Sequence, residues 1–306
     1  MENNKKYTKY TKYTIYTNDL KYKDNRNINF NDVDLTKNNV INKIHINHDS
    51  IDYRYKECSE NQYFSLDFTS IKLITMPQLT DKFLNIKCLF LANNELKNNL
   101  DLSYLKNLIS IDIDNNKLNN ILLPNSIEEI SCQNNLFESI NFYPNLKRLK
   151  ISHNKIKSLP MYPKIEILEA TNNLLTELAQ YENLHRLIIY SNPLKKIYFN
   201  NKLKYADISE TQIVEINKCD NLEHLVANYC LNLNKLPIID SIKSLELMGT
   251  KLNKLYFYKN FEIIIFQINL IQNISSKYKE INANFQLRNN TMLCISKGEF
   301  EIKFEL

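Results

Sequence analysis

The sequence contains little of what most enzymes and membrane proteins need. Its 306 residues include two glycines, Gly249 and Gly298, so a glycine-rich loop around a phosphate group cannot be built. No window approaches the roughly 18 uninterrupted apolar residues of a membrane-spanning helix. The amino terminus, MENNKK, also lacks the apolar region of a signal peptide. We therefore expect neither a membrane span nor secretion.

Cysteine is present, but without the spacing of a disulfide module or a zinc site. The six cysteines form no CxxC pair: Cys58, Cys88, Cys132, Cys219, Cys230 and Cys294. Cys132 and Cys230 occupy repeat positions at which core side chains are expected. This distribution predicts free, buried thiols in a reducing compartment, so we expect a cytoplasmic location.

Histidines are few and poorly placed for catalysis or metal binding. His45 and His48 are three apart on an expected strand and its exit, where side chains face different ways. His153, His185 and His224 have no partner at ligand spacing, and no serine has the context of a nucleophile elbow. We predict a chain that is not an enzyme and has no metal and no cofactor.

What the chain does contain is a repeat with a period of nineteen. The segment LKRLKISHNKIKSLP (146–160) returns as IEILEATNNLLTEL from Ile165 and as LHRLIIYSNPLKKI from Leu184. We call the first residue of each repeat offset 0; apolar residues then recur at offsets 3, 5, 10 and 13, and asparagine at offset 8. About twelve units follow this frame, beginning at Ile41, Tyr63, Ile86, Leu108, Ile127, Leu146, Ile165, Leu184, Leu203, Leu222, Ile242 and Phe261.

This frame resembles the leucine-rich repeat. The resemblance implies an α/β-type but mostly β repeat solenoid, a curved horseshoe with a parallel sheet on its concave face. Nineteen residues leave no room for a helix on the return path, so we expect extended or 3₁₀ convex segments. The run LPMYP (159–163) is similar to the short repeats of bacterial effector leucine-rich proteins, whose period is twenty rather than nineteen. That likeness implies a binding scaffold and nothing enzymatic. The Asn-, Lys- and Ile-rich composition is typical of an AT-rich protist or viral genome.

The repeat also predicts which side chains face the core. In a strand, alternate side chains point to opposite faces, so offsets 3 and 5 should point inward and offsets 2, 4 and 6 outward. The offset-8 asparagine should bond buried backbone groups of successive units, because an amide both donates and accepts. This predicts a ladder of Asn94, Asn116, Asn135, Asn154, Asn173 and Asn192.

The frame divides the chain into three parts. We expect residues 1–40 to be a low-complexity tail and amino-terminal cap, 41–275 the repeat array, and 276–306 a carboxy-terminal cap. A β-hairpin in the cap is indicated around Lys297 and Gly298.

Outward positions in the middle units are unusually apolar and aromatic for a solvated sheet. Aliphatic side chains beside Arg, Tyr and His are typical of a protein-binding surface. The predicted partner-binding residues are Arg148, Lys150, Ile167, Arg186, Ile188, Tyr190, Tyr205, Asp207, His224 and Val226. We predict a monomeric scaffold that binds a protein on its concave face, as a host-directed recognition or adaptor protein in the host cytoplasm if its source is viral or parasitic.

The alternative is a nucleic-acid or phosphate-surface binder that uses the basic amino-terminal tail with Arg148, Lys150 and Arg186. The net charge of +5 is modest, and acidic and basic residues are interspersed. Non-specific nucleic-acid binding needs a concentrated basic face, so the composition favours a protein partner.

Overall fold

The computed structural model describes residues 65–76, 79, 84–252, 254–257, 263–267, 273–276, 283–288 and 292–297. The chain forms two compact units, Met1–Ile127 and Glu128–Leu306, which we describe separately. The predicted tail and the repeat predicted to begin at Ile41 lie outside the described residues.

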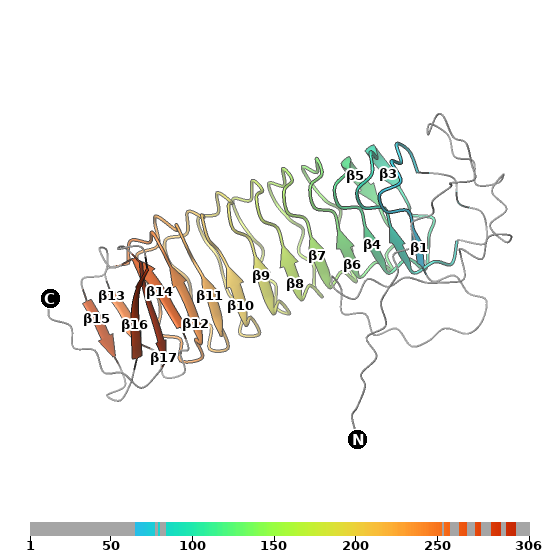
Figure 1. Cartoon of the computed structure of the whole chain (residues 1–306). Coiled ribbons are helices and arrows are strands. Elements are labelled where there is room, and N and C mark those ends of the chain that lie inside the picture. The colour runs from blue at the N-terminus through green and yellow to red at the C-terminus, as the bar shows by residue number, and fades with distance from the viewer. Residues whose placement is uncertain are drawn as a thin grey trace, which may run out of the picture. The chain divides into compact units, whose positions relative to one another are not determined.

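The first unit contains two sets of parallel strands (Figure 1). Strands β1 (Ser65–Asp67), β2 (Cys88–Phe90) and β4 (Ser110–Asp112) pair in parallel in chain order. Strands β3 (Lys97–Asp101) and β5 (Lys117–Leu122) form a second parallel pair on the return segments. The register of that pair shifts between Asn98 and Asn99, where Asn98 has a positive φ of 64°.

The second unit repeats the same strand at intervals of nineteen or twenty residues. Its parallel strands, in chain order, are β6 (Glu129–Ser131), β7 (Arg148–Lys150), β8 (Ile167–Glu169), β9 (Arg186–Ile188), β10 (Tyr205–Asp207), β11 (His224–Val226), β12 (Ser244–Leu247) and β14 (Ile263–Gln267). The pairing joins equivalent offsets, such as Leu149 with Leu168 and Leu168 with Leu187. No helix occurs in the described residues, so the predicted fold class, a mostly β parallel solenoid, is confirmed.

The last described strands pair in a different way from the repeats. Strand β17 (Met292–Lys297) pairs antiparallel with β14 and also with β16 (Ala283–Arg288). The hairpin predicted around Lys297 and Gly298 includes residues after 297, which lie outside the described part, so it stays a prediction. Strands β13 (Lys254–Phe257) and β15 (Asn273–Ser276) pair in parallel as a separate sheet.

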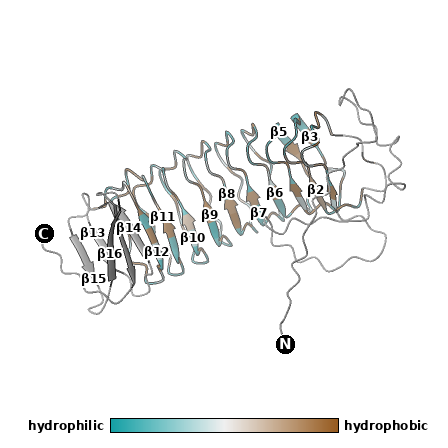
Figure 2. Ribbon diagram, in the orientation of Figure 1, coloured by the Kyte–Doolittle hydropathy of each residue, from teal (hydrophilic) through white to brown (hydrophobic). Residues whose placement is uncertain are grey.

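Alternation along each strand divides the core from the outer face of the sheet. Leu149 and Ile151 at offsets 3 and 5 are 0% exposed, whereas Arg148 and Lys150 at offsets 2 and 4 are half-buried. Strands such as β11 and β12 accordingly carry hydrophobic and hydrophilic residues together (Figure 2). Within each unit, buried aliphatic side chains at equivalent offsets of successive repeats form the core.

The offset-8 asparagines form hydrogen bonds between successive turns. Asn173 Oδ1 accepts the N–H of Ile156 in the preceding turn at 2.9 Å, and its Nδ2 donates to the Ile151 carbonyl at 2.9 Å. The same amide also donates to its own turn, at Ala170 O (3.2 Å). Asn94, Asn116, Asn154 and Asn192 make equivalent bonds. Asn135 donates to the carbonyls of Cys132 and Gln133 within its own turn.

The ladder changes chemistry after Asn192. Thr211 Oγ1 donates to the Ile208 carbonyl at 2.7 Å, and Cys230 Sγ donates to the same carbonyl at 3.0 Å. Thr250 Oγ1 donates to Leu247 O at 3.2 Å. These side chains satisfy an inward-facing carbonyl, but a hydroxyl or thiol is shorter than an amide and makes fewer bonds.

Each turn also holds the residue before the ladder in a left-handed conformation, which we did not predict. Offset 7 has a positive φ in every described repeat from Asn93 to Gly249. Asparagine tolerates this region better than most residues, and it occupies offset 7 at Asn93, Asn115, Asn134 and Asn172. The recurring Asn-Asn pairs therefore do two jobs: the first asparagine adopts the turn, and the second bonds the backbone.

A second ladder lies on the return path. Tyr162 Oη donates to Asn141 O at 3.0 Å, and Tyr181 Oη, one turn later, donates to Pro160 O at 2.9 Å. Burial raises the pKa of both phenols, so both remain protonated donors. In the next turns Asn200 Nδ2 donates to Tyr181 O at 2.6 Å and Cys219 Sγ to Asn200 O at 3.1 Å.

Asn173→Leu should destabilise the fold by about 1–3 kcal/mol, because it leaves the Ile156 N–H buried without an acceptor. It also removes one of the two amide donors from each of the Ile151 and Ala170 carbonyls, which keep Asn154 and Asn192 as their other donors. Asn201→Leu makes the same chemical change at an exposed turn position and should be nearly neutral. Urea denaturation of the two variants measures the difference. Equal midpoints would show that the ladder does not hold the turns.

Two adjacent isoleucines test the strand register. Ile189 is 0% exposed, so Ile189→Ala should lower the free energy of unfolding by about 2–5 kcal/mol. Ile188 is half-buried on the outer face, so Ile188→Ala should cost about 1 kcal/mol or less. Thermal or urea unfolding of both variants provides the comparison, and equal losses would contradict the register.

Candidate partner-binding face of the sheet

Strand pairing in the second unit arranges the predicted binding residues in columns. Arg186, Tyr205 and His224 are register partners on β9, β10 and β11. Ile188, Asp207 and Val226 form the neighbouring column on the same strands. All six side chains are half-buried, as expected for the outer face of a sheet. We call these six residues the central patch.

The first column is a stack of planar groups. The Arg186 guanidinium carbon lies 4.0 Å from the centroid of the Tyr205 ring, which is cation–π geometry. On the other side of Tyr205, its ring centroid is 6.2 Å from that of His224, with the planes tilted by 36°. These contacts restrict the rotamers of the three side chains before any partner binds.

The second column contains a carboxylate in a partly desolvated position. Asp207 Oδ1 accepts the backbone N–H of Ser209 at 3.0 Å. Burial raises the pKa of Asp207, and the negative charge of Glu246 raises it further. Burial also raises the pKa of Tyr205, with the charge of Asp207 adding to the effect.

The other predicted binding residues lie around the central patch. Ile167 on β8 is the register partner of Arg186, and Tyr190 follows β9 at offset 6. Arg148 and Lys150 lie on β7, separated from β10 by β8 and β9. Lys150 Nζ is 3.5 Å from Glu169 Oε2, so its charge is already balanced. The structure therefore separates these two basic residues from Tyr205 and His224.

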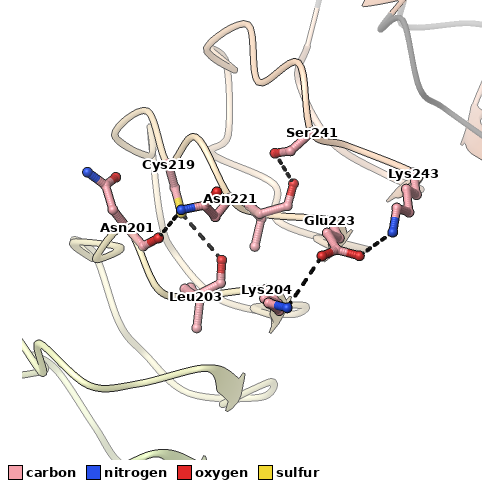
Figure 3. Close-up of polar contacts among 9 residues, drawn as sticks. Asn201, Leu203, Lys204, Cys219, Asn221, Glu223, Ser241 and Lys243 are labelled. Carbon is pink, nitrogen blue, oxygen red and sulfur yellow. Dashed lines mark hydrogen bonds and ion pairs between the residues drawn. The ribbon is translucent and has the colours of Figure 1, made fainter.

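A charged row at offset 1, beside the sheet face, escaped the sequence analysis. Glu223 lies between two lysines, with Lys243 Nζ at 2.5 Å and Lys204 Nζ at 3.8 Å (Figure 3). The hydrogen bond from Lys243 lowers the pKa of Glu223. Farther along, Lys147 and Glu128 pair at 2.7 Å. The signal was the alternation of sign along the row, which is Glu128, Lys147, Glu166, His185, Lys204, Glu223 and Lys243.

Across the described residues, no three His, Cys, Asp or Glu side chains gather as a metal ion would require. Cys88, Cys132, Cys219 and Cys230 are buried free thiols. Nowhere in the described segments is a helix long and apolar enough to cross a membrane.

Comparison with known proteins identifies the fold. No protein-family model matches the chain, and no curated protein sequence matches it. Its structure is similar to that of YopM, a leucine-rich effector protein from Yersinia pestis, with a TM-score of 0.60 and 22% sequence identity. The match covers 71% of this chain and 66% of the YopM chain, so this chain spans about two thirds of that protein's length.

A second solved structure is the functional domain of InlJ from Listeria monocytogenes. It matches with a TM-score of 0.40 and 18% identity over 72% of this chain and 65% of that one. At these identities the comparisons concern the fold alone, and it is the likeness to YopM that establishes it.

The raised pKa of Asp207 predicts a pH-dependent effect on stability. A carboxyl whose pKa is raised in the folded state destabilises the fold above that pKa, and the penalty disappears once the pH falls below its ordinary value of 3.8. Asp207→Asn should therefore raise the melting temperature at pH 7. The gain should shrink as the pH falls toward 3.8.

Thermal melts of the wild type and Asp207→Asn between pH 7 and pH 3.5 provide the test. A variant that is less stable than the wild type at pH 7, or whose gain grows on acidification, would contradict the assigned environment of Asp207.

Proposed function

We propose that this chain, which has the leucine-rich-repeat fold, is a non-enzymatic scaffold that binds a protein partner on the outer face of strands β8–β11. The observation that carries the proposal is the central patch. It combines an ordered Arg–Tyr–His stack with the aliphatic side chains of Ile188 and Val226.

The composition of the patch favours a protein over a small molecule. Binding energy at protein interfaces concentrates in Tyr and Arg side chains within a surface that excludes water. A sheet face with apolar side chains between polar ones is a broad contact surface rather than an enclosed pocket.

The rigidity of the patch supports the same proposal. Its side chains stand on strands whose backbone groups are paired on both sides, and Arg186 is held on Tyr205. Binding to a surface that is already ordered loses less conformational entropy than binding to mobile loops.

The charges near the patch argue against a nucleic-acid partner on this face. Lys150 is paired with Glu169, Arg186 lies on Tyr205, and Asp207 adds a negative charge between β9 and β11. A phosphate backbone is bound by clustered, available cations. The basic tail of the alternative hypothesis lies outside the described residues.

We also propose an intracellular, reducing location for the protein. Four buried free thiols support it, because such residues persist where disulfides do not form. If the source is a virus or a parasite, this location includes the cytoplasm of its host, and the scaffold is then a host-directed recognition or adaptor protein. The description of YopM as an effector accords with that role.

The experiment compares two double variants of the full chain in capture from the native cell, followed by titration of the purified captured protein. Tyr190→Ala with Tyr205→Ala removes two aromatic side chains from the outer face without touching an inward position. Affinity should fall by at least about 30-fold, equivalent to about 2 kcal/mol, while stability changes by about 1 kcal/mol.

The control is Lys157→Ala with Lys195→Ala, which removes two exposed lysines from the return segments. It should leave affinity unchanged. Unchanged affinity in the tyrosine variant together with loss in the lysine control would place binding on the return-path side and overturn the proposal.

A further inference from the structure

The outer face of β10, β11 and β12 carries two carboxylates, Asp207 and Glu246, that form no ion pair with the described residues. At offsets 2 and 4 these strands present Tyr205, Asp207, His224, Val226, Ser244 and Glu246, with no lysine or arginine among them. Two other acids on or beside the sheet in this unit have lysine partners: Glu169 pairs with Lys150, and Glu223 pairs with Lys204 and Lys243 (Figure 3).

Asp207 and Glu246 have hydrogen bonds, but from neutral donors. Asp207 accepts the Ser209 N–H, and Glu246 Oε2 accepts Asn228 Nδ2 at 2.9 Å. Within the described part of the chain, neither carboxylate has a cation at ion-pair distance. Arg186 on β9 lies on the Tyr205 ring, and its charge lowers the pKa of Asp207, although burial has the larger, opposite effect.

The register places an apolar surface between the two carboxylates. Val226 is the register partner of Asp207 on one side and of Glu246 on the other. With strands about 4.8 Å apart, the two carboxylates stand on strands about 10 Å apart, so one cation above β11 can approach both. The aliphatic stem of a lysine or arginine would lie on Val226, because such stems bury readily on apolar surface.

We infer that the partner's contact segment carries a lysine or arginine flanked by apolar residues, and that this cation lies over Val226 between Asp207 and Glu246. The inference rests on the proposed function and specifies the chemistry of the partner at that face. Burial of Asp207 has already removed part of its hydration, so less desolvation remains when a cation pairs with it. An acidic segment would be repelled by both carboxylates.

The test pans the full-length protein against a phage library of random dodecapeptides. The wild type should enrich peptides with lysine or arginine beside apolar residues. Asp207→Asn with Glu246→Gln keeps the shapes of both side chains and removes both charges. It should bind the selected peptides at least ten-fold more weakly and should lose the basic enrichment when panned afresh. Asp207→Asn alone and Glu246→Gln alone should each lose part of the affinity for the selected peptides, so the test does not depend on the folding of the double variant.

The matched control removes two carboxylates from the return segments. Glu177→Gln with Glu215→Gln changes the net charge equally at exposed positions and should leave peptide affinity unchanged. An equal loss in the control would mean that net charge, rather than this pair, attracts the peptides, and would overturn the inference.

The results separate this inference from the proposed function. Peptides that require Tyr190 and Tyr205 but are indifferent to the carboxylates, or that are enriched in acids, overturn the inference alone. Selected peptides whose affinity is unchanged by the tyrosine variant and by the carboxylate variant bind elsewhere on the protein. That result would contradict both the inference and the proposed function.

Two other occupants of this face can be recognised by cross-linking and by sedimentation. Carbodiimide cross-linking of residues 5–12 to Asp207 or Glu246 would assign the face to the chain's own lysine-containing amino-terminal segment. A dimer in sedimentation that the carboxylate variant dissociates would assign it to a second copy. Either result would overturn the inference that a basic segment of a protein partner occupies the face.

Discussion

The fold depends on how each turn satisfies the backbone groups that it carries into the core. At the end of every strand the chain bends inward, and buried N–H and C=O groups must find partners. Asn173 meets this need for two turns at once, because its amide bonds the N–H of Ile156, the carbonyl of Ile151 and the carbonyl of its own Ala170. Once these bonds fix the stacking of turns, the strands pair offset to offset, and the columns of the outer face follow.

Periodicity was sufficient to predict the repeat frame, because each turn buries the same offsets. Leu149 and Ile151 face the core, and Arg148 and Lys150 face out, as strand alternation requires. The second asparagine in each Asn-Asn pair was recognised from its chemistry. The first was missed, because a left-handed backbone position leaves only a weak trace when His153, Ser191 and Tyr229 can also occupy it.

Other features depend on contacts that no spacing rule specifies. Tyr162 and Tyr181 look like irregular apolar residues until their hydroxyls reach the carbonyls of the preceding turn. The repeat frame predicted which residues share the central patch. It did not predict that Arg186 lies on Tyr205, because a long side chain can contact any of several neighbours. That Asp207 has no ion-pair partner among the described residues became visible only from the structure, in which Glu169 pairs with Lys150 and Glu223 pairs with Lys204 and Lys243.

The bonded turns support the proposed binding face, because side chains can be held in columns only if the turns beneath them do not slip. Amide hydrogen exchange tests this directly at the N–H groups of Ile156 and Leu175, which lie outside the strands and bond only to asparagine side chains of the next turn. We predict that they exchange as slowly as the strand amides of Leu168 and Leu187, through opening of the whole array. Exchange of these two amides at the rate of exposed loops, with the strand amides still protected, would contradict the account.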